Sequence, residues 1–199
     1  MCSWGDKLID PDIQVLKIFS DIAETIFRTR KSSISRIEAS NFSEDAKNDL
    51  KEQVVGPLDN TLAFMSRKIQ ITLTLIPIYN LFLKRQDGLN IYDCAQLISL
   101  IKDIENFNTF SNLMSYAGFI PQAKNYNKKL HKLLQRLGYK LINQNPQYRF
   151  IYEINIQRYS EQHPRYSKTH IENMAKRIVI KRFLKNLYFS WKQINKEDF

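Results

Sequence analysis

The spacing of large apolar residues is the feature that most constrains the fold, because they recur at steps of three and four along most of the chain. The clearest run follows Pro57 and consists of Leu58, Leu62, Met65, Ile69, Leu73 and Ile76. Such steps place side chains on one face of an α-helix, and the alternation typical of strands is scarce. The sequence therefore predicts an all-α fold.

Several helix starts are marked by residues that cap a helix. Asp10 before Pro11 and Asn145 before Pro146 each combine a capping side chain with a proline suited to the first helical position. Ser43 is a third cap, and two acidic residues follow it where the positive end of the helix dipole favours them. These signals predict helices that begin at each of these points.

Other residues mark ends and interruptions. Gly56 and Pro57 predict a kink or break in the helix that contains them. Further along the chain, a short helix is expected over residues 78–84. Gly118, with Pro121 just beyond it, is typical of a helix end. Three basic amphipathic helices are predicted after Pro121, the first of them including Tyr126, and residues 194–199 are expected to fray.

Positive charge is concentrated in the second half of the chain. Of the net charge of +10, residues 1–99 contribute −1, since they hold 12 basic and 13 acidic residues. Residues 122–196 hold 17 basic and three acidic residues. This asymmetry favours a polyanion partner over the alternative of a solvated basic face.

The apolar stripe after Pro57 has two interpretations. It can be the inner face of a helical hairpin, or it can be a coiled-coil seam that forms a homodimer through residues 57–76. The sequence predicts two parts, a helical or coiled-coil region at 1–76 and a basic helical domain at 77–199.

Few residues offer chemistry beyond charge. The two cysteines form neither a disulfide framework nor a metal-ligand spacing, and the three histidines are dispersed, so no metal, cofactor or catalytic residue is predicted. No apolar run reaches the roughly 18 residues of a membrane span, and the start lacks a secretory signal. The expectation is a cytoplasmic protein with no membrane contact.

The segment from Lys84 to Asn90 has the composition of a tight turn between two helices. Gly88 accepts a positive φ, and Asn90 does so more readily than most residues. Such a turn can aim backbone N–H groups at a phosphate, with Lys84 and Arg85 adding charge beside it.

Two stretches carry a resemblance to a known family. Residues 87–107 and residues 110–121, the latter containing Ser-Tyr-Ala-Gly-Phe-Ile-Pro, resemble the second half of the Piv/MooV-like insertion-sequence transposases. The resemblance implies a helix-hairpin-helix that follows a coiled-coil region and binds DNA. The family's hairpin is Gly-hydrophobic-Gly after a proline, whereas this chain has Asp87 and then Gly88-Leu89-Asn90.

Two catalytic features of that family are not found in the sequence. Its RuvC-like half carries a DEDD carboxylate set, for which these 199 residues have no room. Its catalytic serine follows the proline of the second stretch, where this chain has residues 122–127 without a serine. The chain is therefore predicted to be non-catalytic, although a metal-dependent nuclease or recombinase subunit stays an alternative.

The function predicted from these observations is binding of double-stranded or structured nucleic acid, DNA rather than RNA, mainly through phosphates. The alternative is a helical protein–protein adaptor, or a structural protein of a virion or mobile element, with a basic interaction face. The predicted DNA-binding residues are Lys84, Arg85, Gly88, Asn90, Lys124, Lys128, Lys129, Lys132, Arg136, Lys176, Arg177, Lys181, Arg182 and Lys185.

Overall fold

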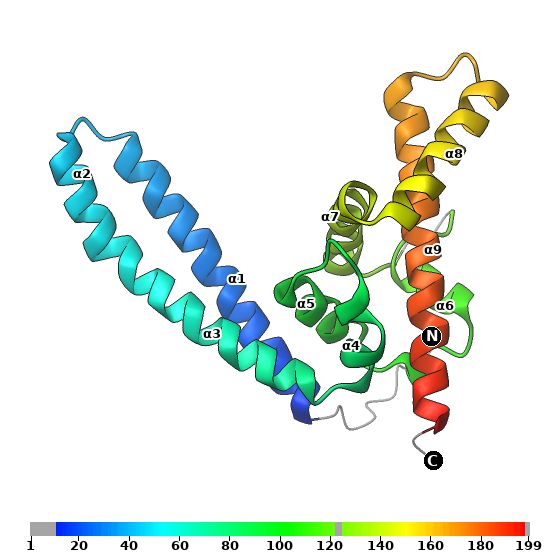
Figure 1. Ribbon diagram of the computed structural model, residues 1–199, viewed down its shortest axis with the longest axis horizontal. Coiled ribbons are helices and arrows are strands. Elements are labelled where there is room, and N and C mark those ends of the chain that lie inside the picture. The colour runs from blue at the N-terminus through cyan, green and yellow to red at the C-terminus, as the bar shows by residue number, and fades with distance from the viewer. Residues whose placement is uncertain (1–10, 122–124, 198–199) are drawn as a thin grey trace.

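The computed structural model describes residues 11–121 and 125–197, and every regular element within these ranges is helical. The all-α prediction is confirmed. Figure 1 shows two helical arms that diverge from a common base. One arm pairs α1 (Pro11–Glu38) with a long helix that comprises α2 (Glu44–Leu50), the π-helical turn η1 (Lys51–Val55) and α3 (Gly56–Thr74).

The other arm pairs α8 with the N-terminal part of α9 (Figure 1). The base contains α4 to α7, the two 3-10 turns η2 and η3, and the rest of α9. The bounds of the elements in this arm and in the base are α4 (Pro77–Leu81), η2 (Leu83–Arg85), α5 (Ile91–Ile101), η3 (Ile104–Asn106), α6 (Phe110–Tyr116), α7 (Lys128–Gln144), α8 (Pro146–Gln162) and α9 (Lys168–Glu197).

The predicted helix starts agree with the structure where it describes them. Ser43 accepts a hydrogen bond from the Ala46 N–H, and Asn145 accepts from the backbone N–H groups of the first turn of α8. α1 begins at Pro11, while its predicted cap, Asp10, lies outside the described residues. Gly118 ends α6 with a φ of 74°. Local capping chemistry thus determines these boundaries.

The helix does not break at Gly56 and Pro57. The π-helical turn precedes them, and the Gly56 N–H bonds to the carbonyl of Lys51, five residues back. A proline has no N–H to give to the helix ladder, and a π-turn spaces the backbone more widely at this point. The predicted interruption is therefore a local change of helix type.

The apolar stripe of α3 packs within the chain. Leu62, Ile69, Leu73 and Ile76 are buried, and α3 contacts both α1 and α5. The core interpretation of the stripe is the one that the structure shows. The homodimer through residues 57–76 stays a prediction, but these four side chains are not exposed to form it.

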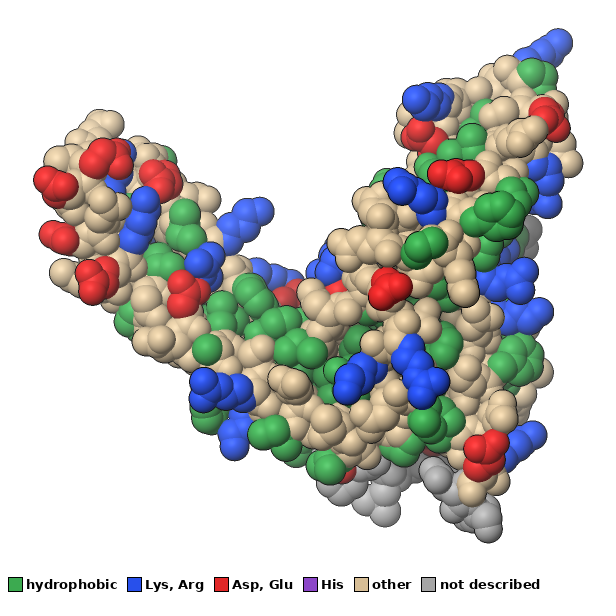
Figure 2. All heavy atoms as spheres, viewed as in Figure 1, with side chains coloured by type: hydrophobic (Ala, Val, Ile, Leu, Met, Phe, Trp, Pro, Cys, Tyr) green, Lys and Arg blue, Asp and Glu red, His purple; other side chains and the backbone are tan. Residues whose placement is uncertain are grey.

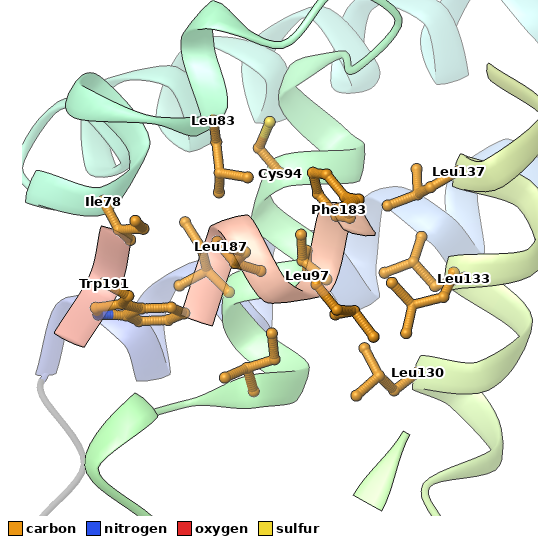
Figure 3. Packing of buried hydrophobic residues seen from close by; sticks show 14 of the residues in the cluster. Ile78, Leu83, Cys94, Leu97, Leu130, Leu133, Leu137, Phe183, Leu187 and Trp191 are labelled. Atoms are coloured by element: carbon orange, nitrogen blue, oxygen red, sulfur yellow. The ribbon is translucent and has the colours of Figure 1, made fainter. Parts of the chain in front are cut away.

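The core of the base lies around α9, α5 and α7. Figure 3 shows Leu97 of α5 between Leu187 of α9 on one side and Leu130 and Leu133 of α7 on the other, with Phe183 of α9 above it. The same cluster of buried residues extends from α1 to the end of α9, and so it includes side chains from both sides of the predicted boundary at residue 76.

Some predicted boundaries were wrong by part of a helix. The helix expected over residues 78–84 is α4 followed by a separate 3-10 turn, and α7 begins at Lys128, after Tyr126. α9 continues to Glu197, although fraying was expected from 194. Ile194 is buried and Lys192 pairs with Glu105, so tertiary contacts hold this end.

Candidate functional site

A groove runs between α1 of the first arm and α5 and α7 of the base. It comprises three adjoining cavities of about 660, 370 and 280 Å3. Lys17 and Lys102 line both the first and the third cavity, while Ser20 and Arg136 line both the first and the second. Along α1 the lining extends from residue 13 to residue 31, which is about 27 Å at 1.5 Å per residue.

The groove is strongly basic. Its lining has eight basic residues against the three carboxylates of Asp21, Glu24 and Asp93, so its net charge is +5. The basic residues are Lys17, Arg28, Lys31, Lys102, Lys129, Lys132, Arg136 and Lys140. Figure 2 shows Lys and Arg side chains in the angle between the arms, and acidic side chains over the far end of the first arm.

A hydrogen bond joins α1 to the opposite wall of the groove. Glu24 of α1 pairs with Arg28 on its own helix and accepts a bond from the Gln96 amide of α5 at 3.5 Å. Arg136 of α7 donates to the Gln96 side-chain oxygen at 2.8 Å. The three helices are therefore joined by one polar network.

Asp93 is the buried anchor of this network, with only 2% of its surface exposed. Lys140 donates to one carboxylate oxygen at 2.5 Å and Arg136 to the other at 3.2 Å. Asp93 also accepts the backbone N–H of Asn90, which closes a capping box at the start of α5. A buried carboxylate needs such partners, and two of the groove's cations are thereby partly neutralised.

Four of the predicted DNA-binding residues line the groove, and three of them, Lys129, Lys132 and Arg136, come from α7. Their spacing of three and four residues puts them on one face of α7. Asn90 lines the second cavity. Lys128 is exposed at the first position of α7, and Lys124 lies outside the described residues.

The predicted phosphate-binding turn has a different structure from the one expected. Gly88 has the positive φ, 93°, but Asn90 has a φ of −97° and acts as the N-cap of α5. The turn packs on α7, so that a Cβ at Gly88 would lie 2.9 Å from the Lys140 carbonyl oxygen. Lys84 and Arg85 are exposed on η2, outside the groove lining.

The predicted DNA-binding residues of α9 do not share one environment. Lys176 is 7% exposed, and its ammonium lies 4.0 Å from the centre of the Tyr139 ring, so it is buried against α7. Arg177 donates to the Phe119 carbonyl at 2.9 Å. Arg182 and Lys185 are exposed and Lys181 is half-buried, and none of the three lines the groove.

Sequence reasoning missed the contribution of α1. Lys17, Ser20, Glu24, Arg28 and Lys31 line the groove and recur at steps of three and four, which is the spacing of one polar helix face. That spacing was a readable signal. A count of charges does not reveal it, because α1 holds four acidic residues against its five basic ones and so carries a net charge of only +1.

Comparison with protein-family models, curated proteins and solved structures found no match for this chain. Within residues 11–121 and 125–197, no helix is both long and apolar enough to cross a bilayer. The same residues contain no group of three or more His, Cys, Asp or Glu side chains placed to hold a metal ion.

Proposed function

We propose that the protein is a non-catalytic DNA-binding protein that contacts phosphates of double-stranded or structured nucleic acid through the groove. The proposal rests on one observation, the convergence of eight basic residues from α1, α5 and α7 on a groove about 27 Å long. Its relation to the DNA-binding half of insertion-sequence transposases is part of the proposal and rests on residues 87–121 alone.

The ion pairing of these residues supports a phosphate partner. Lys129 and Lys132, as well as Lys17 on the opposite wall, form no ion pair with any residue that the structure describes. Like charges held close together repel one another, and a polyanion relieves this repulsion while it releases its own counterions. Phosphate contacts of this kind confer affinity with little base reading.

The test is binding of a fluorescent 30-base-pair duplex, a single strand, a junction and an RNA duplex, followed by anisotropy across a salt series. The duplex or the junction is expected to bind most tightly. The logarithm of the affinity should fall with the logarithm of salt with a slope of about −3 to −5, as neutralising about four to five phosphates implies.

Two double variants with equal charge change locate the binding surface. Lys129→Glu with Lys132→Glu reverses the groove, and Arg182→Glu with Lys185→Glu reverses the exposed face of α9. The groove variant is expected to lose at least 100-fold in affinity at low salt, since two phosphate contacts are lost and two repulsions gained. The α9 variant should lose far less. Equal losses, or no binding by the unmodified chain at low salt, would contradict the proposal.

The adaptor alternative is favoured by a separate observation, apolar side chains exposed on the first arm. Ile18 on α1 is 56% exposed, and Ile71 and Leu75 on α3 are 60% and 61% exposed. Ile71 and Leu75 are four residues apart and so lie on one face, and a contiguous exposed apolar patch typically marks a protein contact. An adaptor would show no salt-dependent affinity for any of the four nucleic acids.

A further inference from the structure

Ser20 is an unusual residue within the groove. Its side chain is 4% exposed, and its hydroxyl has no hydrogen-bond partner within the described part of the chain. A serine or threonine inside a helix commonly donates to the carbonyl four residues back. Thr25 and Thr29 of the same helix do so, but Ser20 does not. A buried hydroxyl left in this way destabilises the folded chain, and a hydrogen bond to a ligand oxygen would remove that cost.

Ser20 lies in the wall of the groove. Ser20 lines both of the larger cavities, at the part of the groove that they share. Lys17 lies one turn before it on α1, and Lys129 and Lys132 lie on the opposite wall. Of the two carboxylates of α1 in the same cavity, Glu24 is already bound by Arg28 and Gln96. The other carboxylate is Asp21, and the basic residues of this cavity outnumber the two carboxylates of α1. The unpartnered Ser20 hydroxyl therefore lies in a cavity with an excess of positive charge.

Lys102 adds a second unusual feature at the same site. It ends α5 with a φ of 67° and a ψ of −78°, and within the described ranges no other residue besides glycine has a positive φ. Such a backbone conformation is strained, and residues that adopt one cluster at ligand sites. Lys102 lines the first and third cavities together with Lys17 and Ser99. The ammonium group of Lys102 thus adds a positive charge to the groove, in the same two cavities as Lys17.

We infer that the groove contains a built site for one phosphate group, held between α1 and α7. The Ser20 hydroxyl donates to a phosphate oxygen, and the ammonium groups of Lys17, Lys129 and Lys132 neutralise its charge. Phosphate fits because it carries both the acceptor oxygens and the negative charge that the site needs. The cavity of about 660 Å3 is within the range of ligand pockets and admits a nucleotide-sized group.

This inference deepens the proposed function, since it uses the same groove, but it does not require that the phosphate belong to a nucleic acid. A terminal phosphate of an oligonucleotide, an internal phosphodiester and a free nucleotide share the chemistry that the site recognises. Binding is therefore measured with pyrophosphate, with a mononucleotide, and with an oligonucleotide of about ten nucleotides that carries either a 5′-phosphate or a 5′-hydroxyl.

The variant that tests the site is Ser20→Ala, studied in the full-length chain. Its melting temperature without ligand should equal or exceed that of the unmodified chain, because the substitution removes an unpartnered buried hydroxyl. Its dissociation constant for pyrophosphate should rise about tenfold, which is the loss of one hydrogen bond to a charged group. Ser32→Ala, at an exposed position of α1 outside the groove, is the matched control and should change neither value.

The outcomes separate the two proposals. Pyrophosphate binding that Ser20→Ala weakens, with no oligonucleotide binding, supports the phosphate site and contradicts the nucleic-acid function. Oligonucleotide binding that Ser20→Ala leaves unchanged contradicts the site and leaves the function intact. A melting temperature lowered by several degrees in Ser20→Ala without ligand would show a structural role for the hydroxyl and overturn the inference.

Discussion

At the scale of single residues, the groove depends on buried groups that sequence patterns describe as ordinary core. Asp93 lies on the same short helix as Cys94 and Ala95, and all three are buried. Only the arrangement of Asn90, Arg136 and Lys140 around it makes a buried carboxylate tenable at this position. The side chains of Arg136 and Lys140 are thereby held at the groove wall.

Cys94 provides a test of this burial. Burial, with a smaller contribution from the Asp93 charge, raises the pKa of the Cys94 thiol from 9.0 to about 12. Between these two values the unfolded chain loses the thiol proton and the folded chain keeps it. The free energy of unfolding is therefore unaffected by this group below pH 9 and falls as pH rises above it, by at most about 1.4 kcal/mol per pH unit.

Urea unfolding at pH 8 and pH 10 measures this effect. The unmodified chain is expected to lose about 1 kcal/mol more than Cys94→Ala over this interval, because the tyrosine contributions are common to both. Equal losses in the two chains would mean that the thiol is accessible to solvent in the folded state.

At the scale of elements, the turn before α5 packs directly against α7. Gly88 lets the chain turn with a φ of 93° while its backbone lies against the carbonyl of Lys140 on α7. The glycine expected to approach a phosphate instead allows two parts of the protein to come close. Gly56 differs from Gly88 in both respects. Its φ is helical, −54°, and no atom lies within 4 Å of the point that a Cβ would occupy.

These two glycines predict opposite effects of the same substitution. Gly88→Ala should lower the free energy of unfolding by about 2 kcal/mol or more, because alanine disfavours this φ and its Cβ meets a backbone oxygen. Gly56→Ala should raise it by about 0.5–1 kcal/mol, because alanine is the better helix former. Urea titration of both variants measures these changes in the free energy of unfolding. A Gly88→Ala variant that is more stable than the unmodified chain would show that the turn does not lie against α7.

At the scale of the whole molecule, the charge is polarised along the first arm. The far end, made of α2 and η1, carries exposed Glu44, Asp45 and Glu52, whereas the part of α1 next to the base carries the groove cations. Figure 2 shows this acidic end. A polyanion would therefore be repelled from the tip of the arm and attracted to the groove.

The core also spans the whole molecule, since Leu73 of α3 and Trp191 of α9 belong to one cluster of buried residues. We expect one cooperative unfolding transition in which circular dichroism and the fluorescence of Trp191, read in a Trp4→Phe background, change together. Leu73→Ala should shift both signals equally, by the roughly 2–5 kcal/mol typical of a large core truncation. A Trp191 transition that stays unmoved would show that residues 1–76 unfold as a separate unit.

The sequence by itself determined the fold class, most helix boundaries and the apolar faces of the helices. These features depend on neighbours within a turn or two, through capping bonds at Ser43 and Asn145 and through the step of three or four residues. It did not determine the π-helical turn at 51–55 or the helical end near Ile194, which depend on backbone adjustment and on distant contacts.

The tertiary structure alone decided which charges act together. Lys17 and Ser20 are more than 100 positions from Lys129 and Lys132, and only the folding of α1 onto the base brings them to one groove. It also removed Lys176 from the surface and tied Arg136 to Asp93. A count of charges along the chain cannot foresee this, because electrostatic attraction depends on distance through space and on burial.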